Sequence, residues 1–226
     1  MKTYELLVFD WDGTLMDSEH RIVTCMQLAA ADCEYPVPGE EAVRNIIGLG
    51  MQEAVLALFP DLGDMGRGGI IEAYRAHWLG NRIPASSLFP GAEKVLQSFA
   101  EAGYLLAVAT GKSRRGLDKV LDETGLGPVF HMTRCADEAH SKPHPQMLED
   151  ILTDLNTPPG DTLVIGDSEY DMQMAGNAGV DALGVVHGVH SSERLRAHGA
   201  LTVLDHLEEL PVWLESNTRI SQEIEA

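Results

Sequence analysis

The chain shows short, continuous apolar runs that alternate with stretches of helical period. The runs are YELLVF (4–9), YLLAVAT (104–110), TLVIG (162–166) and DALGVV (181–186), with LTVL (201–204) as a candidate fifth. Continuous apolar positions are typical of strands that are covered on both faces, as in a parallel sheet. The pattern therefore predicts a sheet of parallel strands.

Helical patterns follow these runs at 91–103, 113–126, 145–155 and 170–179. Gly103, Gly125 and Gly179 stand where the helices are expected to end, because glycine readily adopts the left-handed conformation that terminates a helix. Strands that alternate with helices predict an α/β fold with a doubly wound parallel sheet.

One interval breaks this alternation. Between the first and second strands, helical patterns occur at 18–33, 39–48, 51–59 and 68–81, and no strand pattern is evident. We expect an α-helical cap domain at 17–87, inserted into a core domain formed by 1–16 and 88–226. The crossings near residues 16 and 87 would then act as hinges.

The formal net charge of −19 limits the partners of this chain of 226 residues. Such an acidic protein would be repelled by nucleic acids and by anionic membranes, so neither is expected as a partner. The three cysteines show no CxxC spacing, which is typical of reduced thiols. The apolar run near the N-terminus is too short for a signal peptide or a membrane span. We expect a cytoplasmic protein, with a monomer as the default and a homodimer left open.

Polar side chains follow the predicted strands. Asp10 and Asp12 follow the first strand, Thr110 and Gly111 the second, and Asp167 the third. Because parallel strands bring their carboxyl ends to one edge of a sheet, these residues are expected to converge there. Lys142, in the SKPHP segment, and Asp171, in GDSEYD, are expected to join them.

Clustered carboxylates of this kind need a cation. Oxygen ligands suit Mg²⁺, and a carboxylate such as that of Asp10 can attack a phosphoryl group to give an aspartyl-phosphate. Thr110, the following amide and Lys142 could hold the phosphoryl oxygens as charge develops on them. Asp12 would point to the same side of an extended chain as Asp10 and could serve as general acid and base.

The segments DWDGTL, VATGK, SKPHP and IGDSEYD match, in order and spacing, the four motifs of the haloacid dehalogenase superfamily. The helical insert after the first motif resembles the phosphoglycolate phosphatase-like branch, in which a cap closes over the site. The resemblance covers essentially the whole chain. It implies a Rossmann-like core and a Mg²⁺-dependent phosphatase that hydrolyses a small phosphorylated metabolite, such as phosphoglycolate or a sugar phosphate.

The resemblance also implies roles for individual residues. Asp10 would be the nucleophile and a metal ligand, and Asp12 the acid and base with its carbonyl on the metal. Lys142 would neutralise the nucleophile and the phosphate. The remaining implied roles are phosphate binding by Gly13, Thr110 and Gly111, metal ligation by Asp167, and a contact through water or an orienting role for Asp171. Lys112, at the end of the second motif, and Arg114 could lie near the site, but we favour a structural or solvated role for both.

The sequence of the cap does not identify the substrate. Its segment IIGLGMQEAV (46–55) resembles a substrate-contacting loop but carries no cation, so Arg44 is the nearest candidate for substrate contact. A phosphomutase of the same fold and a catalytically silent phosphate- or metal-binding module remain as alternatives. A dehalogenase is disfavoured, because that branch lacks an acid at the position of Asp12.

Overall fold

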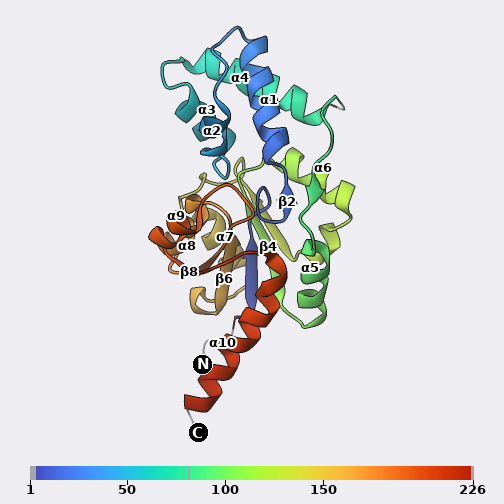
Figure 1. Ribbon diagram of the computed structural model, residues 1–226, viewed down its shortest axis with the longest axis vertical. Helices are drawn as coiled ribbons and strands as arrows, with labels where there is room; N and C mark the ends of the chain where they lie inside the picture. The colour runs from blue at the N-terminus through green and yellow to red at the C-terminus, as the bar shows by residue number, and fades with distance from the viewer. Residues whose placement is uncertain (1–3, 81, 225–226) are drawn as a thin grey trace.

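The computed structural model describes residues 4–80 and 82–224, with side chains as far as residue 217 (Figure 1). Its main sheet has the strand order β5-β4-β1-β6-β7-β8, and every neighbouring pair is parallel. The strands are β1 (Leu6–Phe9), β4 (Leu105–Thr110), β5 (Met132–Cys135), β6 (Thr162–Gly166), β7 (Asp181–Val185) and β8 (Ala200–Leu204). This arrangement confirms the predicted doubly wound α/β fold.

Strand β1 lies in the centre of the sheet between β4 and β6, and all four of its side chains are buried. Leu7 and Phe9 point into one apolar cluster, while Leu6 and Val8 point into another on the opposite face. A strand that is buried on both faces needs apolar residues at every position, which explains its continuous apolar run.

Helices cover both faces of the sheet. The face of Leu7 and Phe9 is packed by α5 (Ala92–Glu101), α6 (Arg114–Thr124) and α10 (Leu210–Ile224). The opposite face is packed by α7 (Gln146–Asp154), α8 (Glu169–Asn177) and α9 (Ser192–Ala197). Short 3₁₀ turns lie at η1 (Gly127–Val129), η2 (Pro159–Asp161) and η3 (Leu207–Glu209). No helix in the described ranges is long and apolar enough to span a membrane.

Some elements of the structure were not predicted from the sequence. Strand β5 lies at the edge of the sheet, and of its residues only Cys135 is buried, so its sequence MTRC lacks the apolar run of the central strands. Helices α9 and α10 were also not predicted. Helix α4 (Asp64–Leu79) begins four residues before the predicted start at Gly68, because it includes Gly66, a residue type that disfavours helix.

The segment between Met16–Asp17 and Ser87–Leu88 forms the helical cap at the top of Figure 1. It contains α1 (Glu19–Asp32), α2 (Glu40–Arg44), α3 (Met51–Leu58) and α4. The chain enters it through β2 (Met16–Asp17) and leaves it through β3 (Ser87–Leu88), and these two strands pair antiparallel. The division of the chain into domains at 17 and 87 stays a prediction, and this strand pair is where the two crossings lie side by side.

Replacing a fully buried leucine of the sheet tests the packing of the core. We expect Leu106→Ala, on β4, to lower the free energy of unfolding by about 2–5 kcal/mol, because the core cannot close the cavity that it leaves. Leu201→Ala on β8 is the control, since Leu201 is 53% exposed and should change stability by less than about 0.5 kcal/mol. Urea unfolding measures both, and equal losses would contradict this packing.

Candidate active site

The site is built around Asp10, which immediately follows β1. Its backbone N–H donates to the carbonyl of Ile165 at 2.9 Å, so the residue continues the pairing of β1 with β6. Its side chain is buried, and Oδ1 accepts a hydrogen bond from the Lys142 ammonium at 2.6 Å. The other carboxylate oxygen, Oδ2, is buried and has no partner among the described residues.

Lys142 is fully buried and bridges two carboxylates. Its Nζ lies 2.6 Å from Asp10 Oδ1 and 2.6 Å from Asp171 Oδ1. The second oxygen of Asp171 accepts hydrogen bonds from the Ser168 amide at 3.0 Å and its hydroxyl at 2.6 Å, which caps the start of α8. Both oxygens of Asp171 are therefore engaged, and its carboxylate orients the lysine toward Asp10.

Asp167 follows β6 and is held by the loops around it. Its Oδ1 accepts from the Thr14 hydroxyl at 2.8 Å, and its Oδ2 accepts from the Val189 amide at 2.9 Å. Gly13, with φ +84°, and Gly188 approach so closely that a Cβ on either would lie 2.1 Å from Asp167 Oδ2. Gly13 therefore gives the turn room for this carboxylate, and its expected role in phosphate binding stays a prediction.

The carboxylates of Asp10, Asp167 and Asp171 gather in one buried cluster, with ligand atoms within 4.8 Å of one another. Burial raises the pKa of Asp10 to about 7, with Lys142 opposing the shift and Asp171 adding to it. Burial also raises the pKa of Asp167, and the negative charges of Asp10 and Asp171 raise it further. Three carboxylates against one ammonium leave excess negative charge, which a cation would relieve.

The donor set fits Mg²⁺. It consists of carboxylate oxygens, which hard divalent cations prefer, and it includes the unpartnered Oδ2 of Asp10. Asp10 and Asp167 are the residues that could offer side-chain oxygens to the metal. The Asp12 side chain lies outside this cluster, and the expected contact through its carbonyl stays a prediction, as does a contact of Asp171 through water.

Asp12 lies at the floor of a cavity that it shares with Asp10. Its Oδ1 accepts from the Ser18 hydroxyl at 2.5 Å and lies 2.8 Å from the Lys112 ammonium. The same ammonium lies 4.0 Å from the ring centroid of Trp78, on cap helix α4. Although the sequence favours a structural or solvated role for Lys112, the structure places it against the expected acid and base, where a cation–π contact joins it to the cap.

The backbone of the cap loop packs directly against the second motif. Thr110 is fully buried, and its Oγ1 accepts from the Lys112 amide at 3.2 Å. Gly111 lines the cavity, and a Cβ there would lie 2.5 Å from the Leu49 carbonyl and 2.8 Å from that of Gly48. Glycine at position 111 is thus what allows the cap loop to reach this edge of the sheet.

Hydrogen bonds hold the same loop on the core. The Gly50 amide donates to Ser141 Oγ at 2.7 Å, and the Tyr170 hydroxyl donates to the Asn45 carbonyl at 2.8 Å. Arg194 also donates to Asn45 Oδ1 at 2.5 Å. The structure therefore shows a cap that is docked over the carboxylate cluster.

Arg44 takes a different position from the residues above. Its guanidinium pairs with Glu19 at 3.2 Å, its side chain is 42% exposed, and it lines a separate hollow with Arg194 and His190. It is not among the residues that line the cavity above Asp10 and Asp12. The arginines that do line this cavity are Arg75 and Arg115, which the sequence does not single out. Substrate contact by Arg44 stays a prediction.

Sequence reasoning did not single out Thr14, Ser18 or the amide of Val189, which contact expected site residues, or Trp78 and Arg115, which line the cavity, and it favoured another role for Lys112. Thr14 lies inside the DWDGTL motif and Ser18 just after it, so a hydroxyl near the first motif was an available signal. Lys112 lies inside the VATGK motif, whereas Trp78, Arg115 and Val189 lie outside the four motifs, and no local pattern indicates their positions.

The comparisons with known proteins agree with this geometry. Residues 7–185 match the family of haloacid dehalogenase-like hydrolases. This protein belongs to that family. It is 33% identical over 211 residues to the "Probable phosphatase IndB" of Dickeya dadantii, with 91% of each chain covered. It is 27% identical to a phosphoglycolate phosphatase of Vibrio parahaemolyticus, with 91% of this chain and 94% of the relative covered.

A solved structure shares the fold. The match is a haloacid dehalogenase-like hydrolase from Bacteroides fragilis, with a TM-score of 0.86 and 24% identity, covering 92% of this chain and 100% of the other. The likeness extends over the core and the cap. The protein is therefore a hydrolase of this family, and the curated relatives described above are named phosphatases.

We expect Mg²⁺ to raise the melting temperature, and to raise it more at pH 8 than at pH 6. Because the pKa of Asp10 is raised to about 7, a proton competes with the metal below that pH. The same shift destabilises the metal-free fold as pH rises from about 4 to about 7, since an unfolded aspartate titrates near pH ~3.9. The stabilisation by Mg²⁺ should therefore increase with pH, while the metal-free protein becomes less stable.

Differential scanning fluorimetry with and without Mg²⁺ measures this effect. Asp167→Asn should remove most of the Mg²⁺-dependent increase, while Asp122→Asn, at an exposed position on α6, should keep it. A Mg²⁺-dependent increase of the same size at both pH values would contradict the assignment of Asp10 to the metal site.

Proposed function

We propose that this hydrolase is a Mg²⁺-dependent phosphatase that cleaves a small phosphomonoester through an aspartyl-phosphate on Asp10. One observation carries the proposal. Asp10 is held by the Lys142 ammonium through one oxygen, its other oxygen has no partner among the residues that the structure describes, and it shares the cavity floor with Asp12. A positioned nucleophile, a neutralising cation and an acid beside them are the groups that phosphoryl transfer requires.

In the first step, a carboxylate oxygen of Asp10 attacks the phosphorus and the ester P–O bond breaks. The Asp12 carboxyl gives its proton to the departing alcohol oxygen. Lys142 balances the charge that stays on the Asp10 carboxylate and the transferring phosphoryl group. The amide of Gly111, which lines the cavity, and the buried Thr110 before it are proposed to hold phosphoryl oxygens as their charge increases.

In the second step, water attacks the phosphorus of the aspartyl-phosphate while Asp12 removes a proton from it. The P–O bond to Asp10 breaks, which releases inorganic phosphate and restores the carboxylate. Mg²⁺, when bound by Asp10 and Asp167, would neutralise the negative charge of the phosphate and of the carboxylates around it. The Ser18 and Lys112 contacts keep the Asp12 side chain aimed at the cavity through both steps.

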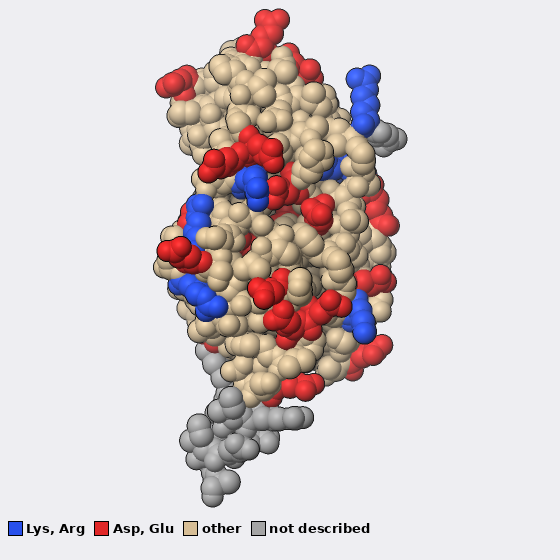
Figure 2. Space-filling view, in the orientation of Figure 1, with Lys and Arg blue, Asp and Glu red and all other residues tan. Residues whose placement is uncertain are grey.

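The overall charge of −19 makes local cations necessary for an anionic substrate. Figure 2 shows acidic side chains over much of one face, with Lys and Arg fewer. Lys142 and Lys112 supply positive charge inside the site, with ammonium groups within 3 Å of the Asp10 and Asp12 carboxylates respectively. The curated relatives support a small phosphorylated metabolite as substrate, for which phosphoglycolate and sugar phosphates are the initial candidates.

We expect Asp10→Asn to abolish phosphate release, because an amide oxygen cannot form the aspartyl-phosphate. Asp122→Asn, the exposed control on α6, should keep wild-type activity. Phosphate release from p-nitrophenyl phosphate, with and without Mg²⁺, measures both, and circular dichroism checks the fold. If the folded Asp10→Asn protein keeps more than a few per cent of the activity, Asp10 is not the nucleophile.

We expect Asp12→Ala to slow hydrolysis of an alkyl phosphate about 10²–10⁴-fold, the usual contribution of a general acid and base. The loss should be smaller for p-nitrophenyl phosphate, because p-nitrophenolate leaves without needing a proton. Single-turnover rates with the two substrates measure this difference. Equal losses with both substrates would contradict protonation of the leaving group by Asp12.

The same assays separate the alternatives. Absence of phosphate release from wild-type protein under all conditions would favour a silent binding module. Transfer of labelled phosphate between sugar phosphates, without its release to water, would favour a phosphomutase.

A further inference from the structure

A cavity of about 290 Å³ extends from Asp10 and Asp12 up into the cap. This volume lies just below the ~300–1,000 Å³ found for small-molecule sites. Its upper walls are mainly apolar and come from the cap, and they include Ile22, Met26, Ile46, Met51 and Trp78. A phosphate and two carbons would leave most of these walls in contact with water, which is unfavourable.

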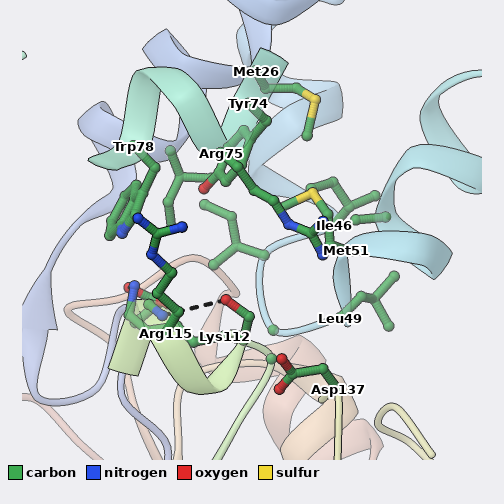
Figure 3. A pocket seen from close by; sticks show the side chains of 18 of the residues that line it. Met26, Ile46, Leu49, Met51, Tyr74, Arg75, Trp78, Lys112, Arg115 and Asp137 are labelled. Carbon is green, nitrogen blue, oxygen red and sulfur yellow. Dashed lines mark hydrogen bonds and ion pairs between the residues drawn. The ribbon is translucent and has the colours of Figure 1, made fainter. Parts of the chain in front are cut away.

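Two polar side chains that line this cavity have no hydrogen-bond or ion-pair partner in the part of the chain that the structure describes. In Figure 3, Arg115 extends from α6 toward the cap, and its guanidinium lies on the side of Trp78 and Tyr74. Within the described part of the chain, no hydrogen bond or ion pair engages the Arg115 guanidinium or the Tyr74 hydroxyl, although both residues line the cavity.

The neighbouring arginines differ in this respect. Arg75 also lines the cavity, but it pairs with Glu72 at 2.5 Å. Arg114, next to Arg115 on the same helix, pairs with Glu138 at 2.8 Å. In a protein with a net charge of −19, a guanidinium without a carboxylate partner is available for an anionic ligand.

We propose that the substrate is a phosphomonoester whose alcohol has an apolar body and carries a carboxylate at the end far from the phosphate. The proposal rests on the proposed phosphatase function. The phosphate would lie at Asp10, the body against the apolar walls, and the carboxylate on Arg115, with the Tyr74 hydroxyl as a second donor. A planar guanidinium matches a carboxylate through two parallel hydrogen bonds, which gives this end its selectivity.

Three phosphates of primary alcohols test the proposal: phosphoglycolate, benzyl phosphate and 4-carboxybenzyl phosphate. We expect kcat/KM to be lowest for phosphoglycolate, and to be about tenfold higher for 4-carboxybenzyl than for benzyl phosphate, the usual effect of one hydrogen-bonded charge pair. The gain should appear mainly in KM, because the carboxylate lies far from the reacting atoms.

Arg115→Met tests the residue itself, because methionine keeps much of the apolar stem and removes the charge. The ratio of kcat/KM for 4-carboxybenzyl over benzyl phosphate should fall from about tenfold to near one. Lys119→Met is the matched control, since Lys119 lies one turn further along α6 and pairs with Glu123. This control should keep the wild-type ratio, and an unchanged ratio in Arg115→Met would overturn the assignment of Arg115.

Binding measurements keep this proposal separate from the proposed function. The corresponding phosphonates cannot be hydrolysed, and their affinities for the wild-type protein in Mg²⁺ can be measured by calorimetry. If no phosphate is hydrolysed but 4-carboxybenzyl phosphonate binds most tightly, the phosphatase function fails and the cavity assignment stands. If phosphoglycolate is hydrolysed best and its phosphonate binds most tightly, the phosphatase function stands and the present inference fails.

Discussion

The buried ammonium of Lys142 is the interaction on which the site depends. It lies 2.6 Å from carboxylates of both Asp10 and Asp171, in surroundings where like charges repel strongly. Its positive charge offsets part of the repulsion among the carboxylates and opposes the rise in the pKa of Asp10. Removal of one partner from such a buried group leaves an uncompensated charge, so the arrangement is stable only as a whole.

The sheet determines where this cluster forms. Because β1 lies between β4 and β6, the residues that follow these three strands meet at one edge, and the loop after β5 brings Lys142 to the same place. The active-site edge is therefore a consequence of strand order. The cap then covers it, and one apolar cluster continues from the core into the cap, which gives the two parts of the chain a common packing surface.

The sequence was sufficient to predict the fold and the gathering of Asp10, Asp167 and Asp171 at one edge of the sheet, and the reasons are physical. Central strands are buried on both faces, so their apolar runs are visible, whereas the half-exposed edge strand β5 carries no such run. The acidic residues were predicted to lie together because they follow strands directly. The contacts of Lys112 with Asp12 and Trp78, and the position of Arg115, depend on how two separate segments pack, which no local pattern reports.

The hydrogen bonds between the cap loop and the core have an evolutionary consequence. Of the three that hold the loop within the described ranges, two use its own main chain, the Gly50 amide and the Asn45 carbonyl. Main-chain groups persist through almost any amino-acid replacement. Side chains of the cap walls can therefore change to fit a new metabolite while the cap loop keeps its hydrogen bonds to the core. Substrate specificity can then diverge in evolution without loss of the catalytic groups.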